Sequence, residues 1–147
     1  MTTALDLALD GAALFLPAAA TVTDLRSRRI PHALTLPALA AAPIMLAASG
    51  RGTEALLAVA GALASALIPA LLCATRAAGG GDLQLCAALG SLLGPFPGLL
   101  AQLTAFAIVA AYLAARQLRA NPSTPPRREL PFAPALLAGA TLACLLR

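Results

Sequence analysis

The chain has 147 residues, a length that suits one domain over 1–147, and it is strongly apolar. Hydrophobic residues make up 60% of it and charged residues only 11%, whereas a soluble domain usually carries about 25% charged residues. The composition therefore excludes an ordinary soluble protein. It predicts an all-α, polytopic integral membrane protein whose first partner is the lipid bilayer.

The net charge of +4 does not indicate a nucleic-acid partner. All ten basic residues are arginines, and most lie in short breaks between apolar blocks, which is typical of a topology signal. Aromatic residues make up only 3% of the chain, so no basic stripe with interleaved aromatics exists. The three cysteines lie far apart and show no C-x-x-C spacing. We therefore expect no nucleic-acid binding, no metal and no cofactor.

Six apolar blocks follow one another along the chain, separated by polar, glycine-rich or proline-rich breaks. A membrane-spanning helix needs about 20 apolar residues, and the first three blocks approach this length. The fourth is short by itself, so 83–115 could form one span plus a surface helix, or two short spans that meet at Pro95 and Pro97. The blocks cover residues 4–23, 32–49, 55–75, 83–94, 98–115 and 133–146.

The distribution of arginines decides between these two interpretations. If 83–115 holds two spans, only Arg51 and the terminal Arg147 fall on one side of the membrane. The positive-inside rule then predicts about six transmembrane helices, with both termini outside and the arginine-rich side in the cytoplasm. The arginines on that inner side are Arg26, Arg28, Arg29, Arg76, Arg116, Arg119, Arg127 and Arg128.

Two of the six acidic residues stand apart from the others. Asp24 and Asp82 each lie at a junction between an inner loop and an apolar helix. Two spans separate them, and an even number of crossings returns the chain to the same membrane face. Both carboxylates are therefore expected at the same depth, near the cytoplasmic boundary. The remaining acids are expected to be solvated charges at helix ends or in the inner loop: Asp6, Asp10, Glu54 and Glu129.

The chemistry of such a pair has two interpretations. Two carboxylates in a poorly hydrated site cannot easily both ionise, so one holds a proton and the other can act as a base toward water. Alternatively, Asp24 caps a helix or pairs with Arg26 or Arg28, and Asp82 is the N-cap of a helix that begins at Leu83. Topology leaves both open.

Three consecutive glycines favour the first interpretation. An N-cap needs one suitable residue, not Gly79–Gly81 before it. Glycines allow unusual φ angles and the close approach of another backbone. An extended substrate segment beside Asp82 would use both properties.

The same residues resemble a known family, the type IV prepilin peptidases, which are membrane aspartic proteases of the GxGD type. The resemblance is carried by "GGGD" at 79–82, "DLRSRRIPHALTLP" at 24–37 and "LPFAPALLAG" at 130–139, in the order of the family. Larger family members carry an extra segment with paired C-x-x-C motifs and also methylate their product. This chain lacks C-x-x-C and is similar to the short form found with tight-adherence (Tad/Flp) pili, so methyltransferase activity is not expected.

The resemblance implies an aspartic endopeptidase without a cofactor. It would cleave the basic leader of prepilins or pseudopilins at the cytoplasmic face of the cell inner membrane. Asp24 and Asp82 match the catalytic aspartates of the family, and Gly79 and Gly81 match the motif glycines that position the substrate. Candidate substrate contacts are Arg26, Arg28, Arg29, Pro131 and Phe132.

Two positions depart from the family pattern. His32 stands where asparagine is usual, and Gln84 stands where lysine is usual. These departures leave open an inactive membrane subunit of a pilus or secretion machine as an alternative function. A proton-coupled transporter with Asp24 and Asp82 as relay acids is a third, although the inverted repeats common in transporters are absent from the sequence. The sequence favours no particular oligomeric state.

Overall fold

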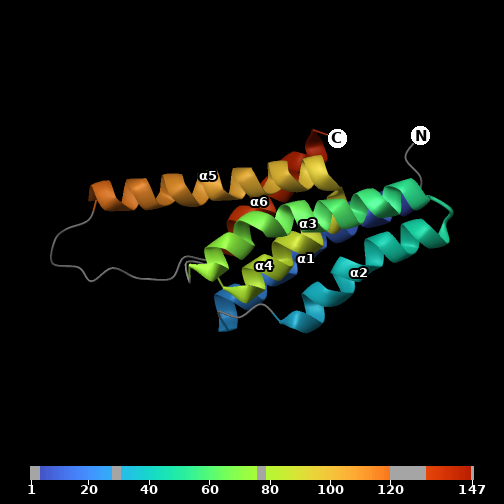
Figure 1. Cartoon of the computed structure of the whole chain (residues 1–147). Coiled ribbons are helices and arrows are strands. Elements are labelled where there is room, and N and C mark those ends of the chain that lie inside the picture. The colour runs from blue at the N-terminus through green and yellow to red at the C-terminus, as the bar shows by residue number, and fades with distance from the viewer. Residues whose placement is uncertain (1–3, 28–30, 76–78, 120–131, 147) are drawn as a thin grey trace.

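The fold is known from a computed structural model that describes residues 4–27, 31–75, 79–119 and 132–146. These ranges contain six helices and no strand, which confirms the all-α prediction (Figure 1). Each apolar block forms one helix, with ends that differ by a few residues from those expected. The helices are α1 (Ala4–Ser27), α2 (His32–Ala48), α3 (Gly52–Ala74), α4 (Gly80–Leu93), α5 (Pro95–Arg119) and α6 (Phe132–Leu145).

The helices differ in whether they can cross a membrane. Within the described ranges, α1, α3 and α5 are long and apolar enough to do so. α4 and α6 have 14 residues each. At about 1.5 Å per residue such a helix is about 21 Å long, which is less than the ~30 Å hydrocarbon core of a bilayer. The described residues therefore form six helices, while six complete spans remain a prediction.

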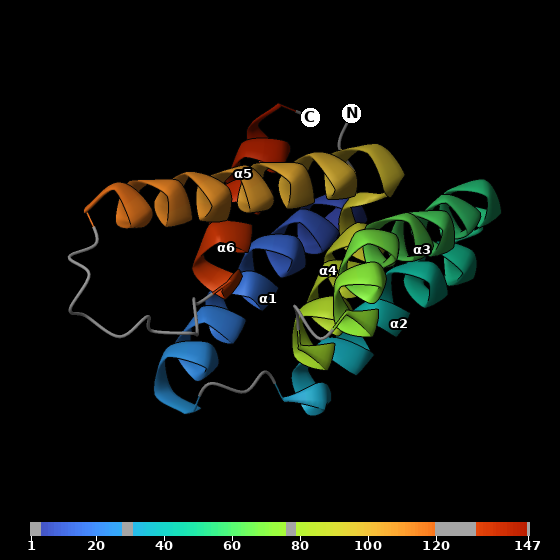
Figure 2. The same ribbon diagram turned by 60° about the vertical axis from the view of Figure 1, so that its left-hand side comes forward.

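The short helix α4 lies at the centre of the bundle. It buries nine consecutive residues, Leu85 to Leu93, and packs against all five other helices (Figure 2). A helix that is buried all round needs small or apolar side chains on every face. Its sequence meets this requirement. After Leu93 the chain reverses at Gly94, whose φ of +84° favours glycine, and α5 begins at Pro95.

Backbone-to-backbone contact holds α3, α4 and α5 together. A Cβ placed on Gly61 of α3 would collide with the carbonyl oxygen of Gly90 in α4, and would lie 2.7 Å from the carbonyl carbon of Gly94. A Cβ on Gly98 of α5 would lie 2.8 Å from the Cα of Gly90. Such close approach through small residues is how membrane helices pack tightly without a hydrophobic driving force. The position of α4 is therefore set by these glycines.

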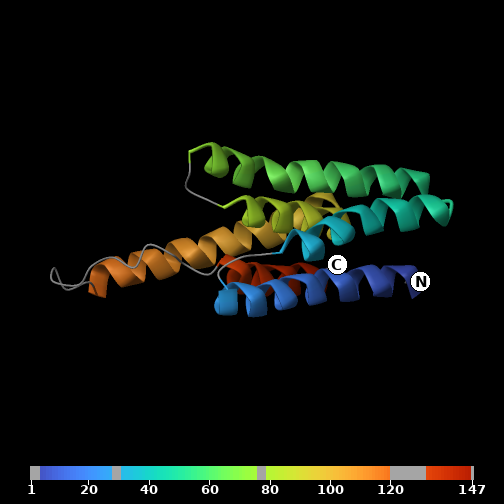
Figure 3. The same cartoon turned by 90° about the horizontal axis from the view of Figure 1, so that it is seen from below.

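The helices place Asp24 and Asp82 at one end of the bundle. The C-terminal end of α1 and the N-terminal ends of α2 and α4 lie at this end, as Figures 1 and 3 show. We call this end the aspartate end. In both views α5 runs past the other helices at this end. The N-terminus of α1 and the turn between α2 and α3 lie at the opposite end.

An ion-pair cluster of Arg51, Asp6 and Glu54 lies at that opposite end. The Arg51 guanidinium donates to Asp6 at 2.7 Å and also to Glu54, which joins α1 to the start of α3. The hydrogen bond to Glu54, and next the one to Asp6, raises the pKa of Arg51. Asp6 and Glu54 lie in the first turns of α1 and α3, as expected, and the fold adds an ion pair of each with Arg51.

Candidate active site

Asp24 lies in the last turn of α1 and is partly buried. Its carboxylate accepts a hydrogen bond from the backbone N–H of Ala133, the second residue of α6. The first N–H groups of a helix have no partner within the helix, and an anion is favourable at that end. Asp24 therefore caps α6, a helix that lies far away in the sequence, and so fixes the start of α6 against α1.

Asp82 is the third residue of α4 and follows the N-cap residue Gly79. Its carboxylate accepts a hydrogen bond from the Gly79 N–H, and its own N–H donates to the Gly79 carbonyl at 3.1 Å. An acidic residue three positions after the cap that bonds back to the cap is one half of a capping box. The alternative that Asp82 is itself the N-cap of a helix from Leu83 was wrong, because α4 begins at Gly80.

The glycines before Asp82 do not use unusual backbone angles. Among the described glycines only Gly50 and Gly94 have a positive φ, so this part of the expectation was wrong. The glycines provide space instead. A Cβ on Gly80 would meet no atom within 4 Å, and one on Gly79 would meet only Asp82 Oδ2, at 3.9 Å. The backbone next to the Asp82 carboxylate is therefore open to another chain.

The two carboxylates lie on neighbouring helices. α1 and α4 pack against each other, and the negative charge of Asp24 acts on Asp82. Each carboxylate accepts a hydrogen bond from a backbone N–H, which fixes its orientation and leaves further lone pairs for water or substrate. Cys86, one turn after Asp82 on α4, is buried.

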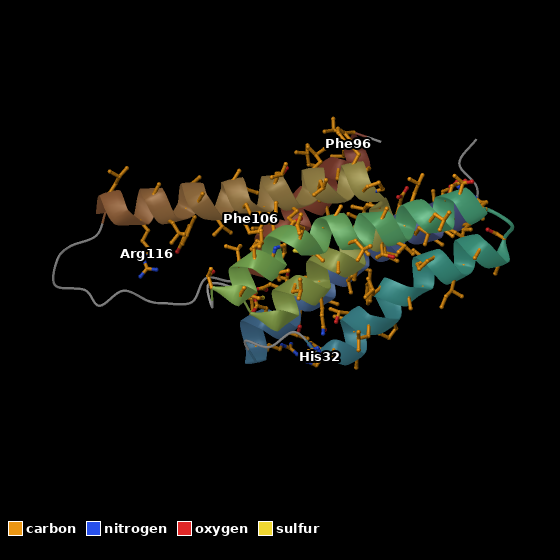
Figure 4. The ribbon with its side chains drawn as sticks, viewed as in Figure 1. His32, Phe96, Phe106 and Arg116 are labelled. Atoms are coloured by element: carbon orange, nitrogen blue, oxygen red, sulfur yellow. The ribbon has the colours of Figure 1, made fainter. Side chains whose placement is uncertain are left out.

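The other residues predicted for the site have different positions. Arg26 is exposed on α1 and makes no ion pair with Asp24 in the part of the chain that the structure describes. The ring of Phe132 packs against Phe106 of α5, with ring centroids 5.3 Å apart, and so joins α6 to α5. Figure 4 shows Phe106 on α5 near the middle of the bundle. Outside the described residues lie Arg28, Arg29, Pro131 and Glu129.

Sequence reasoning missed several contacts of the site. The Cys73 thiol donates to the Gly79 carbonyl at 3.3 Å and so ties the end of α3 to the N-cap of α4. His32 Nδ1 lies 2.5 Å from Gln84 Oε1, and the Thr35 hydroxyl donates to the same oxygen at 3.0 Å. The sequence singled out His32 and Gln84 separately, but their spacing along the chain carries no sign that they touch.

The described residues contain no group of three or more His, Cys, Asp or Glu side chains that could hold a metal ion. A cavity of about 230 Å³ lies at the opposite end of the bundle, with Asp6, Glu54 and Phe96 in its lining. The aspartate site is instead a surface at the ends of several helices. Its chemistry is that of two carboxylates and the backbone donors around them.

Comparison with known proteins identifies the family. The family model described as the type IV leader peptidase family matches residues 12–114, a range that includes both Asp24 and Asp82. No curated protein and no solved structure matches the chain. The family match covers well over half of the sequence and agrees with the resemblance found in its motifs. The chain therefore belongs to the type IV leader peptidase family.

Proposed function

We propose that the protein is an aspartic endopeptidase that removes the basic leader of prepilins or pseudopilins, with Asp24 and Asp82 as its catalytic pair. The observation that carries this proposal is the packing of α1 against α4, which places Asp24 and Asp82 at the same end of the bundle (Figure 1) in a chain of a leader peptidase family. The proposed substrate is a prepilin of the tight-adherence (Flp) type.

The reaction needs one ionised and one protonated carboxyl group. The ionised carboxylate takes a proton from a water molecule, whose oxygen then attacks the scissile carbonyl carbon. The protonated carboxyl donates a hydrogen bond to the carbonyl oxygen and stabilises the charge that develops there. When the tetrahedral intermediate collapses, the C–N bond breaks, the leaving amine takes up a proton, and the pair is ready again. Neighbouring carboxylates favour this shared-proton state because they cannot easily both ionise.

The substrate would bind as an extended segment over the glycines. Peptide bonds within a helix are shielded, so the region of the cut must be extended to reach Asp82. The Gly79–Gly81 backbone would lie against it, with Gly79 and Gly81 as positioning residues. The basic leader meets an arginine-rich face, so recognition would rest mainly on the apolar helix that follows the leader. An acidic substrate residue beyond the cut would pair with an arginine among Arg26, Arg28 and Arg29.

Substitution of Gly80 tests this placement directly. A valine at Gly80 should lower prepilin cleavage at least about tenfold, because its side chain would occupy space that no described atom fills and that the substrate needs. The protein itself should fold normally for the same reason. Turnover and thermal unfolding of purified Gly80→Val protein are the measurements. Gly11→Val is the control, since Gly11 of α1 is also surrounded by open space but lies toward the other end of the bundle. Equal turnover by both variants would show that no substrate passes Gly80.

We infer that the protein lies in the cell inner membrane with the aspartate end at the cytoplasmic face. The arginine distribution supports this orientation. A reporter fused after Arg119 should therefore read as cytoplasmic and one inserted at Gly52 as external. A periplasmic signal at Arg119 would contradict the orientation and would separate the aspartates from the leader, which is on the cytoplasmic side.

Purified wild-type protein in detergent, mixed with a prepilin, provides the test of the proposed function. We expect the leader to be released, with a single cut after a glycine, visible by mass spectrometry. An inactive membrane subunit, the alternative that the departures at His32 and Gln84 suggest, would leave the prepilin intact.

A further inference from the structure

We propose that His32, Thr35 and Gln84 form a hydrogen-bonded clasp between α2 and α4 that positions Asp82 relative to Asp24. His32 and Gln84 would then be positioning residues for peptide cleavage. The inference rests on the proposed function for its kinetic consequences, although the clasp itself can be tested without any substrate.

The clasp is built around one acceptor atom. Gln84 Oε1 receives the Thr35 hydroxyl at 3.0 Å and lies 2.5 Å from His32 Nδ1. Thr35 is buried, with 1% of its surface exposed, whereas His32 lies at the exposed start of α2 (Figure 4). The amide oxygen of Gln84 therefore receives one donor from the interior of the bundle and one from its surface.

The chemistry of the acceptor determines where the histidine proton lies. An amide oxygen can only accept hydrogen bonds, so His32 Nδ1 must carry the proton in this contact. The neutral ring with its proton on Nδ1 and the doubly protonated ring both meet this condition. The clasp therefore persists when the charge of His32 changes, and its role is to hold position.

The start of α4 needs such a tether. From Leu85 onward α4 is buried on all sides, so its neighbours hold it. Gly80 is exposed, and the residues from Gly81 to Gln84 are only partly buried. Helix ends with few buried contacts open most easily. Asp82 lies within this weakly held turn, between the thiol contact of Cys73 with Gly79 and the clasp at Gln84.

A second hydrogen bond between α2 and α4 shows that α2 can hold α4 in place. Seven residues after Gln84, the Ser91 hydroxyl donates a hydrogen bond to the Leu39 carbonyl of α2 at 2.9 Å. Ser91 is fully buried. α2 is therefore joined to α4 by polar contacts at two levels. The deeper contact fixes the distance between the helices, and the clasp extends this fixed geometry to the turn that carries Asp82.

Substitution of His32 by asparagine or glutamine tests whether the hydrogen bond to Gln84 is what matters at this position. The asparagine Nδ2 is two bonds from Cβ, as is the histidine Nδ1, so His32→Asn can still donate to Gln84. The glutamine amide lies one bond further out and cannot reproduce the contact in place. We expect His32→Ala and His32→Gln to lower kcat about 100-fold with a smaller change in KM, which is the cost of a misplacement of about 1 Å. His32→Asn should recover most of the lost rate.

Carbon-13 NMR of the aspartate carboxyl groups tests the clasp without substrate. The chain has four aspartates, so selective labelling gives four signals that single Asp→Asn variants assign. In detergent, His32→Ala and His32→Gln should change the chemical shift and titration midpoint of Asp82, and His32→Asn should keep both. The signals of Asp6 and Asp10, toward the other end of α1, should stay unchanged in every variant and so report intact folding.

The outcomes distinguish this inference from the proposed function. If wild-type protein cleaves no prepilin but the Asp82 signal follows the expected pattern, the peptidase proposal fails and the clasp stands. If wild-type protein cleaves and all three His32 variants match it, with the Asp82 signal unmoved, the clasp is overturned. Equal losses in His32→Asn and His32→Gln would also overturn it, because those variants differ only in whether they can reach Gln84.

Discussion

Asparagine in place of Asp24 or Asp82 should abolish prepilin cleavage while the protein stays folded in the membrane. Asparagine retains a side-chain oxygen that can accept the hydrogen bond from Ala133 or Gly79, so the local structure should persist. It can neither accept nor donate the proton that the reaction moves. Since general acid–base catalysis by one group contributes about 10²–10⁴-fold, we expect each variant to lose at least about 10³-fold in rate. Leader release by purified protein in detergent, followed by mass spectrometry, is the measurement.

The control for these variants is Asp10→Asn. It makes the same chemical change on α1 but lies about four helical turns before Asp24, so turnover should stay close to that of the wild type. Substantial cleavage by Asp82→Asn would exclude an aspartic mechanism. Loss of cleavage in Asp10→Asn as well would show that the assay reports membrane insertion or folding and not the chemistry of the pair.

Alanine in place of Gly61 should have the largest effect on stability. The added Cβ would collide with the Gly90 carbonyl oxygen and would lie 2.7 Å from the Gly94 carbonyl carbon and 2.9 Å from the Pro95 nitrogen. All three atoms are backbone, so no side chain can rotate away, and α3 must move off α4. We expect the free energy of unfolding to fall by about 3 kcal/mol or more, at the upper end for overpacked sites.

Gly11→Ala is the matched control for this substitution. Gly11 lies within α1 with no atom within 4 Å of an added Cβ, so the methyl group meets no obstacle. Alanine is the better helix former by about 0.5–1 kcal/mol, and this variant should be slightly more stable than the wild type. Because Cys86 is 1% exposed, its reaction with a maleimide during denaturant titration measures opening of the core. Similar maleimide kinetics in the two variants would contradict close packing of α3 on α4.

The sequence by itself determined the class of the protein and the order of its helices. Apolar blocks separated by arginine, glycine and proline predict helices in a bilayer. An unpaired backbone N–H or C=O group is costly in lipid, and a helix pairs these groups within one segment. The motifs around Asp24 and Asp82 also indicated the family, which the family match over 12–114 confirms. An even number of helices between the two aspartates was enough to predict that they face the same side.

Only the tertiary structure decided how these helices are arranged. Lipid and a protein interior are both apolar, so an apolar block does not reveal whether it faces lipid or, like α4, is buried by five neighbours. Helix starts depend on hydrogen bonds of single residues, which is why α4 begins at Gly80 and not at Leu83. The hydrogen bond from the Ala133 N–H to the Asp24 carboxylate joins segments far apart in the chain, and so does the contact of His32 with Gln84. Such contacts follow from packing, and no spacing within one segment of the sequence encodes them.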